Sequence, residues 1–248
     1  MIIDFHTHVL PGIDDGSPDI DMTEAMLREE KKQGVDRVVA TPHFYADRDS
    51  MGHFIGKRNA ACEKVLKRAE ELETGVFPAL SLGAEIYYFP GMGTADQLPM
   101  LAIDGGSTIL LEMPFMQWTE AVFRDVQAII EKQKLHIVLA HVERYIAFQK
   151  DVRVWEKVME LPLIPQINTG SFMRHKTGLF RKDKRRSFAM DFLKEHPGII
   201  LGSDCHNVTG RSPNMAEGRK AIEEELGADA LKIIDRITEE VLHDRFEV

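Results

Sequence analysis

The sequence predicts a single α/β domain over residues 1–248, built as a barrel of parallel strands. Seven short runs are apolar on both faces, as buried parallel strands tend to be. Helix-like stretches separate most of these runs, and a strand followed by a helix, repeated about seven times, favours a parallel barrel. No break in composition divides the chain, and 44% hydrophobic residues suffice for one large core. An open, doubly wound sheet is the topological alternative.

The apolar runs define the expected strands. In chain order they lie at residues 1–5, 36–41, 76–82, 107–113, 135–140, 163–168 and 198–203. The first is Met1-Ile2-Ile3-Asp4-Phe5, and later strands contain Ile109-Leu110-Leu111, Ile137-Val138-Leu139-Ala140 and Ile199-Ile200-Leu201. Their shortness and lack of polar alternation are typical of strands that are covered on both sides.

The stretches between the strands have helical spacing. Residues 19–33 are amphipathic and acidic at their start, and residues 53–73 are charged with apolar residues at helical intervals. Further helices are expected at 119–133, 151–160, 183–196, 213–225 and 228–242. Two longer connections are expected to lie over the rim of the barrel: the Gly/Pro-rich segment Phe89–Gly93 and the basic stretch Arg174–Arg186.

The composition argues against several classes of protein. A formal net charge of −9 does not favour a general attraction to nucleic acid or to an anionic membrane. Two cysteines, Cys62 and Cys205, argue against a disulfide scaffold and suit a reducing cytosol. Neither a signal-peptide pattern nor an apolar run of transmembrane length is found. We therefore expect a soluble, cytoplasmic protein without membrane insertion, and the sequence leaves its oligomeric state open.

Potential metal ligands stand at the ends of the expected strands. His6-Thr7-His8 follows the first run, and because side chains alternate along a strand, His6 and His8 face the same side. The carboxyl ends of the strands of a parallel barrel meet at one rim, where active sites are built. The other candidates at strand ends, or in the turns after them, are Asp14, His43, Glu85, Glu112, His141, Asp204 and His206.

Each of these residues has an ordinary explanation when it is considered alone. A histidine at a strand end often makes only structural hydrogen bonds, and the pair Asp14-Asp15 is typical of a solvated turn or helix cap. Carboxylates such as Glu85 and Glu112 are costly to bury at the end of an apolar strand unless they are paired or bound to a cation. Because six strand ends share the pattern, we predict a multinuclear metal site. Histidine and carboxylate ligands without thiolate suit Mn²⁺, Fe²⁺, Zn²⁺ or Mg²⁺.

Such a site suits the hydrolysis of phosphate esters. Four ligand carboxylates against three divalent cations leave a local charge of about +2. Arg144 and Arg211, which follow His141 and His206, would present guanidinium groups that suit phosphate oxygens. Clustered cations lower the pKa of a bound water from about 15.7 toward about 7, which supplies hydroxide for attack. The absence of an uncommitted general acid favours aryl phosphates, because a phenolate with a pKa of about 10 leaves without one.

Residues 205–211 also fit the C-x5-R spacing of cysteine-dependent phosphatases. A strand precedes Cys205 and a helix follows Arg211, as that interpretation requires. However, the loop contains a single glycine, and Asp204 would raise the pKa of the neighbouring thiol by charge repulsion. This interpretation also leaves the ligands at the other strand ends without a role.

Together, the motifs resemble the PHP (polymerase and histidinol phosphatase) superfamily. They are His6-Thr7-His8, Thr41-Pro42-His43, Glu85, Glu112, His141 and Gly202-Ser203-Asp204-Cys205-His206. The longer strings His6-Thr7-His8-Val9-Leu10-Pro11-Gly12-Ile13-Asp14-Asp15-Gly16 and His141-Val142-Glu143-Arg144-Tyr145 resemble its bacterial protein-tyrosine phosphatase branch, whose members are encoded with capsule and exopolysaccharide genes. The similarity extends from residue 1 to about residue 211.

The resemblance implies a (β/α)7 distorted TIM-like barrel, the PHP fold, with three divalent metal ions, usually Mn²⁺. It implies that one metal is bound by His6, His8, Glu85 and Asp204. A second would share Glu85 and add Glu112 and His141, and a third would use Asp14, His43 and His206. Asp15 is the alternative to Asp14, because adjacent carboxylates in a turn can exchange roles.

The resemblance also implies an activity. Arg144 and Arg211 would bind the substrate phosphate and act in catalysis beside Asp204. The expected substrate is a phosphotyrosine protein, namely the tyrosine-rich tail of a bacterial tyrosine kinase that controls polysaccharide export.

Two segments depart from the pattern of that branch, and they keep other functions open. Phe44-Tyr45-Ala46-Asp47 lacks basic character, and Phe172-Met173-Arg174-His175 replaces a more apolar stretch. The sequence therefore supports phosphatase activity more strongly than it supports a preference for phosphotyrosine. A small phosphomonoester such as histidinol phosphate is the alternative substrate. In a non-enzymatic alternative, the metals are structural and the acidic surface docks a kinase.

Overall fold

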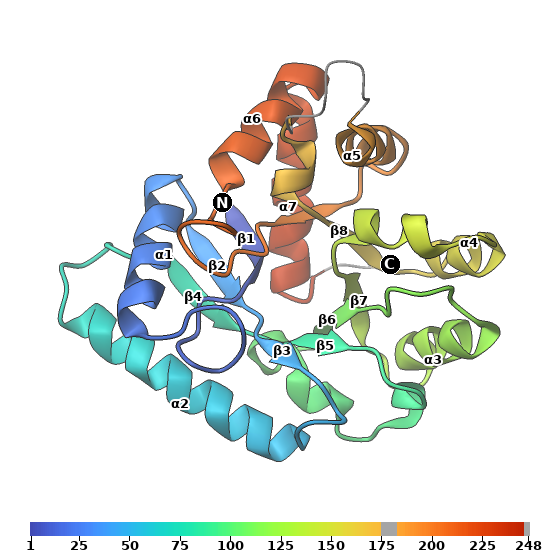
Figure 1. Cartoon of the computed structure of the whole chain (residues 1–248), viewed down its shortest axis with the longest axis horizontal. Coiled ribbons are helices and arrows are strands. Elements are labelled where there is room, and N and C mark those ends of the chain that lie inside the picture. The colour runs from blue at the N-terminus through green and yellow to red at the C-terminus, as the bar shows by residue number, and fades with distance from the viewer. Residues whose placement is uncertain (175–182, 246–248) are drawn as a thin grey trace.

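Strands and helices alternate along the chain in the predicted order (Figure 1). The computed structural model describes residues 1–174 and 183–245, so the predicted connection Arg174–Arg186 lies largely outside the described residues. The strands are β1 (Ile3–Thr7), β2 (Arg37–Ala40), β3 (His43–Phe44), β4 (Ala79–Leu82), β5 (Glu85–Tyr87), β6 (Thr108–Glu112), β7 (His136–Leu139), β8 (Ile164–Asn168) and β9 (Ile200–Gly202).

The helices begin and end close to the predicted residues. They are α1 (Ile20–Lys32), α2 (Met51–Glu70), α3 (Glu120–Glu131), α4 (Arg153–Met159), α5 (Lys184–Glu195), α6 (Met215–Leu226) and α7 (Ala228–Leu242). α2 begins two residues before its predicted start because Ser50 caps it, accepting a hydrogen bond from His53 N at 3.3 Å. The Gly/Pro-rich segment after β5 leads into a short 3-10 turn, η1 (Met92–Thr94).

Two short strands lie beyond the predicted ones. β2 and β4 fall within the predicted strands 36–41 and 76–82, whereas β3 follows β2 after Pro42 and β5 follows β4 after Gly83. Proline has no backbone N–H to donate, but the Pro42 carbonyl still accepts a hydrogen bond from Glu85 N at 3.0 Å. β3 and β5 therefore continue the β2–β4 pair beyond a local irregularity and extend His43 and Glu85 to the rim.

The strands close into a ring of parallel pairs. β1 pairs with β2 and β2 with β4; β3 pairs with β5, and β5 to β9 then pair in succession. A parallel bridge between Thr7 and Cys205 joins β1 to β9, and His8 N donates to the Cys205 carbonyl at 2.9 Å. The predicted (β/α)7 barrel is confirmed. The open sheet is wrong, because an open sheet would leave β1 and β9 as separate edges.

Alternate strand residues fill the inside of the barrel. The buried cluster includes Ile3, Phe5, Val39, Leu110, Val138, Ile164 and Ile200. Ile237 and Val241 of α7 pack against the same cluster. Beyond α7, Asp244 accepts hydrogen bonds from Ser107 N at 3.0 Å and Ser107 Oγ at 2.9 Å, just before β6. α7 therefore closes the amino-terminal end of the barrel and leaves the functional rim at the opposite end.

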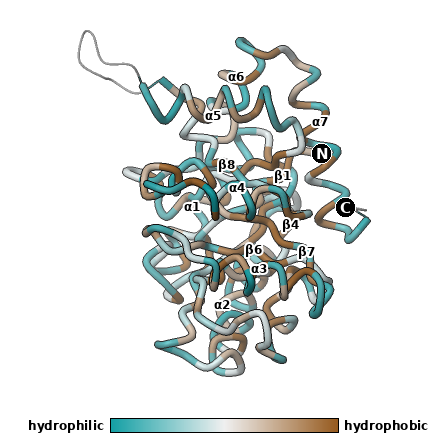
Figure 2. The backbone as a smooth tube through the Cα atoms, turned by 90° about the vertical axis from the view of Figure 1, so that its right-hand side faces the viewer, coloured by the Kyte–Doolittle hydropathy of each residue, from teal (hydrophilic) through white to brown (hydrophobic). Residues whose placement is uncertain are grey.

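The helices surround the strands. Figure 1 shows α1 and α2 on one side of the strands, α3 and α4 on the other, and α5 and α6 above them, whereas α7 extends down to the level of the strands. The strands carry much of the hydrophobic colour in the tube of Figure 2, and hydrophilic residues dominate the outer turns. None of the helices within the described ranges combines the length and apolar character that crossing a bilayer requires.

Candidate metal centre

The first group of candidate ligands joins β1, β5 and the end of β9. His6 Nε2 and His8 Nε2 are 3.2 Å apart. Glu85 Oε2 lies 3.2 Å from the first of these atoms and 3.3 Å from the second, and Asp204 Oδ1 lies 3.8 and 3.5 Å from them. Four ligand atoms about 2.1 Å from one tetrahedral ion are about 3.4 Å apart. His6, His8 and Glu85 therefore have the spacing that a single divalent cation requires, and Asp204 Oδ1 lies beside both imidazole nitrogens.

The second group consists of Glu85, Glu112 and His141. His141 Nε2 lies 2.8 Å from Glu85 Oε1 and 3.6 Å from Glu112 Oε1. Glu85 thus presents one oxygen to each group, as a carboxylate that bridges two cations would. Burial, together with the charges of Glu85 and Asp204, raises the pKa of Glu112 to about 9, and burial lowers the pKa of His141 to about 4. A cation would reverse the effect on Glu112, because it favours the ionised carboxylate.

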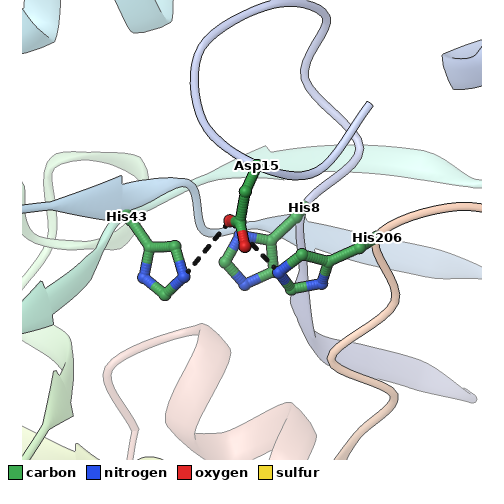
Figure 3. A group of neighbouring side chains, drawn as sticks. All are labelled: His8, Asp15, His43 and His206. Carbon is green, nitrogen blue, oxygen red and sulfur yellow. Dashed lines mark ion pairs between the residues drawn. The ribbon is translucent and has the colours of Figure 1, made fainter. Parts of the chain in front are cut away.

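The third group consists of Asp15, His43 and His206, beside His8. Asp15 Oδ1 lies 3.5 Å from His43 Nε2 and 3.4 Å from His206 Nε2. Figure 3 shows the Asp15 carboxylate between these two imidazole rings, with the His8 ring behind it. The His8 and His206 ring centroids are 3.9 Å apart, which connects this group to the first.

Asp14, the ligand expected for the third group, lies elsewhere. Its Oδ2 accepts hydrogen bonds from the His8 ring, at 2.7 Å from Nδ1, and from the backbone N of His43 at 3.0 Å. Its Oδ1 accepts one from Gly16 N at 2.9 Å. Because these bonds turn Asp14 toward the far side of the His8 ring, the adjacent Asp15 faces the imidazoles. The structure thus favours the alternative assignment, with Asp15 in the place of Asp14.

The atoms that face the centre fit divalent cations. Glu85 Oε2, His43 Nδ1 and His206 Nε2 are buried and make no regular hydrogen bond in the part of the chain that the structure describes, although Glu85 Oε2 lies 2.9 Å from His43 Nδ1 and His206 Nε2 lies 3.4 Å from Asp15 Oδ1. Unpaired buried polar atoms are costly, and they are rare in folded proteins. Nitrogen and oxygen ligands without thiolate suit Mn²⁺, Fe²⁺, Zn²⁺ or Mg²⁺. Bound cations would satisfy these atoms.

A bulge in β1 turns His6 into the centre. Between two paired positions β1 advances from Asp4 to Thr7, whereas β2 advances only from Val38 to Ala40. Asp4 lies against Glu30 of α1, outside the barrel. Regular alternation would place His6 on the same outer side as Asp4, so the additional residue in β1 is what directs the imidazole inward.

Two candidate ligands have left-handed backbones. φ is 31° at His141 and 55° at Asp204, values that residues other than glycine rarely adopt. Such conformations cost on the order of 1–3 kcal/mol and cluster at functional sites. His141 and Asp204 each lie two positions beyond the last residue of a strand, β7 and β9, and the turns direct their side chains toward the shared rim.

Two polar residues of β8 support the ligands, and the sequence analysis did not single them out. Gln166 Oε1 accepts from His141 N at 2.8 Å and lies 3.1 Å from His6 Nδ1, and Gln166 Nε2 donates to Asn168 Oδ1 at 2.9 Å. Asn168 Nδ2 in turn donates to Asp204 Oδ2 at 2.9 Å. Groups of this kind orient metal ligands. Their spacing of two residues inside an otherwise apolar strand was an available signal.

The two predicted phosphate-binding arginines converge on one ligand. Arg144 Nη2 and Arg211 Nη2 each lie 2.7 Å from Asp204, on different oxygens. Together with Ser171 and Arg185 they line a cavity of about 140 Å³ beside the centre. This cavity thus presents positive charge next to the candidate metal ligands.

The environment of Cys205 excludes the cysteine-phosphatase interpretation. The thiol is fully buried and lies 3.6 Å from Glu30 Oε1, away from Arg211. Burial, and the neighbouring Glu30 and Asp4, raise the pKa of the thiol well above its usual value. A protonated, inaccessible thiol cannot serve as a nucleophile.

Known proteins resemble this chain in sequence. The chain is 28% identical over 241 residues to tyrosine-protein phosphatase YwqE of Bacillus subtilis (strain 168), an alignment that covers 92% of this chain and 86% of the relative. It is 28% identical over 242 residues to tyrosine-protein phosphatase CpsB of Streptococcus agalactiae, covering 92% of each.

Solved structures have the same fold. A crystal structure from work on YwqE of Bacillus subtilis and CpsB of Streptococcus pneumoniae, described as metal-dependent tyrosine phosphatases, matches with a TM-score of 0.79 and 23% identity, covering 100% of this chain and 96% of that one. The phosphotriesterase homology protein of Escherichia coli matches with a TM-score of 0.54 and 13% identity over 94% of this chain and 95% of that one. A model of the family described as capsular polysaccharide synthesis, CpsB/CapC, matches residues 2–242, and the chain therefore belongs to the CpsB/CapC family.

Proposed function

We propose that this chain is a metal-dependent protein-tyrosine phosphatase that acts in the control of capsule or exopolysaccharide synthesis. The observation that carries the proposal is the connected set of histidine and carboxylate side chains, most of them buried, with two arginines on its rim. Membership of the CpsB/CapC family, whose relatives bear the name tyrosine-protein phosphatase, supports the same activity.

The proposal assigns three divalent cations, with Mn²⁺ the expected metal, to the three groups. The ligands of the first are His6, His8, Glu85 and Asp204; of the second, Glu85, Glu112 and His141; of the third, Asp15, His43 and His206. Six positive charges against the carboxylates of Asp15, Glu85, Glu112 and Asp204 leave about +2 at the centre. An acidic protein can therefore bind a phosphate dianion locally.

Each part of the site has a role in hydrolysis. When bound, divalent cations lower the pKa of a coordinated water and neutralise the oxygens of an in-line displacement. Arg144 and Arg211 each use one nitrogen for Asp204, which leaves further N–H groups for phosphate oxygens. Asp204 thus acts as both ligand and anchor for the two guanidinium groups. The leaving phenolate has a pKa of about 10 and needs no dedicated acid.

The proposed substrate is a phosphotyrosine protein, and a bacterial tyrosine kinase is the partner that capsule control would require. A cytoplasmic location belongs to the proposal, because Cys62 and Cys205 are free thiols, as a reducing compartment favours.

The test compares a phosphotyrosine peptide with histidinol phosphate as substrates of metal-stripped protein, before and after Mn²⁺ is added back. We expect peptide hydrolysis only with Mn²⁺, a loss of at least 100-fold in His6→Ala, and retention in Cys205→Ser. Circular dichroism of each variant controls for folding. Full activity after all metals are stripped would contradict the proposal, as would a loss confined to Cys205→Ser. Faster turnover of histidinol phosphate than of the peptide would establish the small-molecule alternative.

A further inference from the structure

An aromatic cavity adjoins the candidate ligand Glu112. Its volume is about 510 Å³, and it is lined by residues of three segments that follow neighbouring strands. Tyr45 comes from the loop after β3, Tyr87 ends β5, and Phe115 follows β6. Glu112, at the end of β6, contributes to the same wall, so the cavity is continuous with the candidate metal centre.

The rings of the cavity are arranged against the imidazoles of candidate ligands. The Tyr45 ring centroid lies 5.3 Å from that of His43, and the Phe115 centroid lies 6.0 Å from that of His141, with an angle of 17° between the ring planes. Tyr87 lies 5.5 Å from Tyr45 and extends the same wall. These separations are typical of aromatic pairs. The aromatic wall of the cavity thus lies directly beside the candidate metal ligands.

Further contacts hold this wall in place. The Arg48 guanidinium lies 4.3 Å from the centre of the Tyr45 ring, which is partly buried between Arg48 and His43. Phe115 also contacts the buried ring of Tyr145 at 5.3 Å, and it remains 38% exposed. A preformed apolar wall with exposed ring surface gains contact area when another ring stacks on it.

We propose that this cavity, which we name the Tyr45–Tyr87–Phe115 cavity, binds the phenyl ring of the substrate and makes the enzyme select aryl over alkyl phosphates. The inference rests on the proposed phosphatase function. A cavity of about 150 Å³ is enough to hold benzene, so the available volume accommodates a phenyl group and its Cβ. A phosphate bound at the cations places its ester substituent within reach of this wall, because Glu112 belongs to both.

Calorimetric binding of two non-hydrolysable ligands tests the cavity without turnover. Phenylphosphonate and methylphosphonate share the anionic head and differ only in the ring, so the ratio of their dissociation constants isolates the ring contribution. With the Mn²⁺-loaded protein, we expect phenylphosphonate to bind about tenfold more tightly than methylphosphonate. The preference should fall at least threefold in Tyr87→Leu and in Phe115→Leu, with methylphosphonate binding unchanged.

Two matched variants complete the design. Tyr45→Phe keeps the aromatic face and should keep the preference, whereas Tyr45→Leu should lose it. Phe123→Leu replaces a partly buried ring on α3 that does not line the cavity, and it should bind both ligands as the wild type does. A preference that is absent in the wild type, or unchanged in the Tyr45, Tyr87 and Phe115 leucine variants, overturns the inference.

The failure of this inference is distinguishable from failure of the proposed function. If the protein hydrolyses the phosphotyrosine peptide and every variant keeps the wild-type preference for phenylphosphonate, the phosphatase function stands and the role of the cavity is rejected. If the leucine variants abolish the preference for phenylphosphonate but the protein does not hydrolyse the peptide, the cavity is an aryl-anion site and the phosphatase function is rejected.

Discussion

Asp14 and Asp15 occupy one turn, yet their carboxylates face different partners. Asp15 approaches the rings of His43 and His206, whereas Asp14 lies 2.7 Å from His8 Nδ1. Burial alone would raise the pKa of Asp14, but the hydrogen bond and charge of His8 prevail and lower it to about 2. An ionised Asp14 therefore fixes the orientation of the His8 ring and leaves Nε2 free to bind a cation.

Substitution of the two aspartates separates these roles. Asp15→Asn removes a charged ligand, so we expect about one equivalent less metal after dialysis. Asp14→Asn should keep the metal count at saturation and weaken affinity about 10- to 100-fold, as loss of an orienting hydrogen bond does. Elemental analysis during Mn²⁺ titration measures both, with Asp49→Asn as the control on a carboxylate that pairs with His53. Equal behaviour of the two variants at the turn would argue against the assignment of Asp15.

β1 and β9 meet where the barrel closes, and side chains supplement their few backbone contacts. Asp4 Oδ1 accepts hydrogen bonds from His6 N at 3.2 Å and from Ser203 N at 2.8 Å. Gly202 permits the close approach of the two strands, because a Cβ there would lie 2.5 Å from the Cβ of His6. The packing of β9 against β1 therefore sets the distance between the first and last ligands of the first group.

Adding one methyl group at this junction should disturb the metal site. We expect Gly202→Ala to lower the free energy of unfolding by about 1–3 kcal/mol, as overpacking does, and to weaken Mn²⁺ binding because His6 must move. Gly198→Ala is the matched control in the segment before β9, since a Cβ there has nothing within 4 Å. Urea unfolding and metal titration measure the two effects. Wild-type metal affinity in Gly202→Ala would mean that the junction does not position His6.

The ligands come from strands distributed around the whole barrel, so cation binding should couple to global stability. β1 and the end of β9 contribute to the first group, β5 and β6 to the second, and β3 to the third. A ligand that binds only the folded state stabilises it by mass action. Cations bound by the candidate ligands would in this sense cross-link elements that are remote in sequence.

Thermal unfolding with and without Mn²⁺ measures this coupling. At free Mn²⁺ about 100-fold above its dissociation constant, binding to one site contributes about 2.7 kcal/mol, which corresponds to a rise in Tm of roughly 5–10 °C for a chain of this size. His6→Ala should reduce the rise, and His196→Ala, away from the centre, should not. Identical Tm values with and without Mn²⁺ would show that the described groups do not bind the ion.

The sequence by itself determined the order of the elements and the barrel class. Apolar runs and helical periodicity are local properties, and each predicted strand and helix within the described residues is present. The sequence also places histidines and carboxylates at strand ends. This placement predicted which side chains meet, because parallel strands bring their carboxyl ends to one rim. The resemblance to the PHP superfamily added the grouping of those ligands.

Only the tertiary structure decided the details that depend on contacts between distant segments. The choice of Asp15 over Asp14 depends on which carboxylate the His8 ring and the His43 backbone engage. The bulge in β1 and the left-handed backbone at His141 and Asp204 redirect side chains against simple alternation. Residue type and spacing specify the candidate ligands, whereas their orientation is set by hydrogen bonds and packing across the closed barrel.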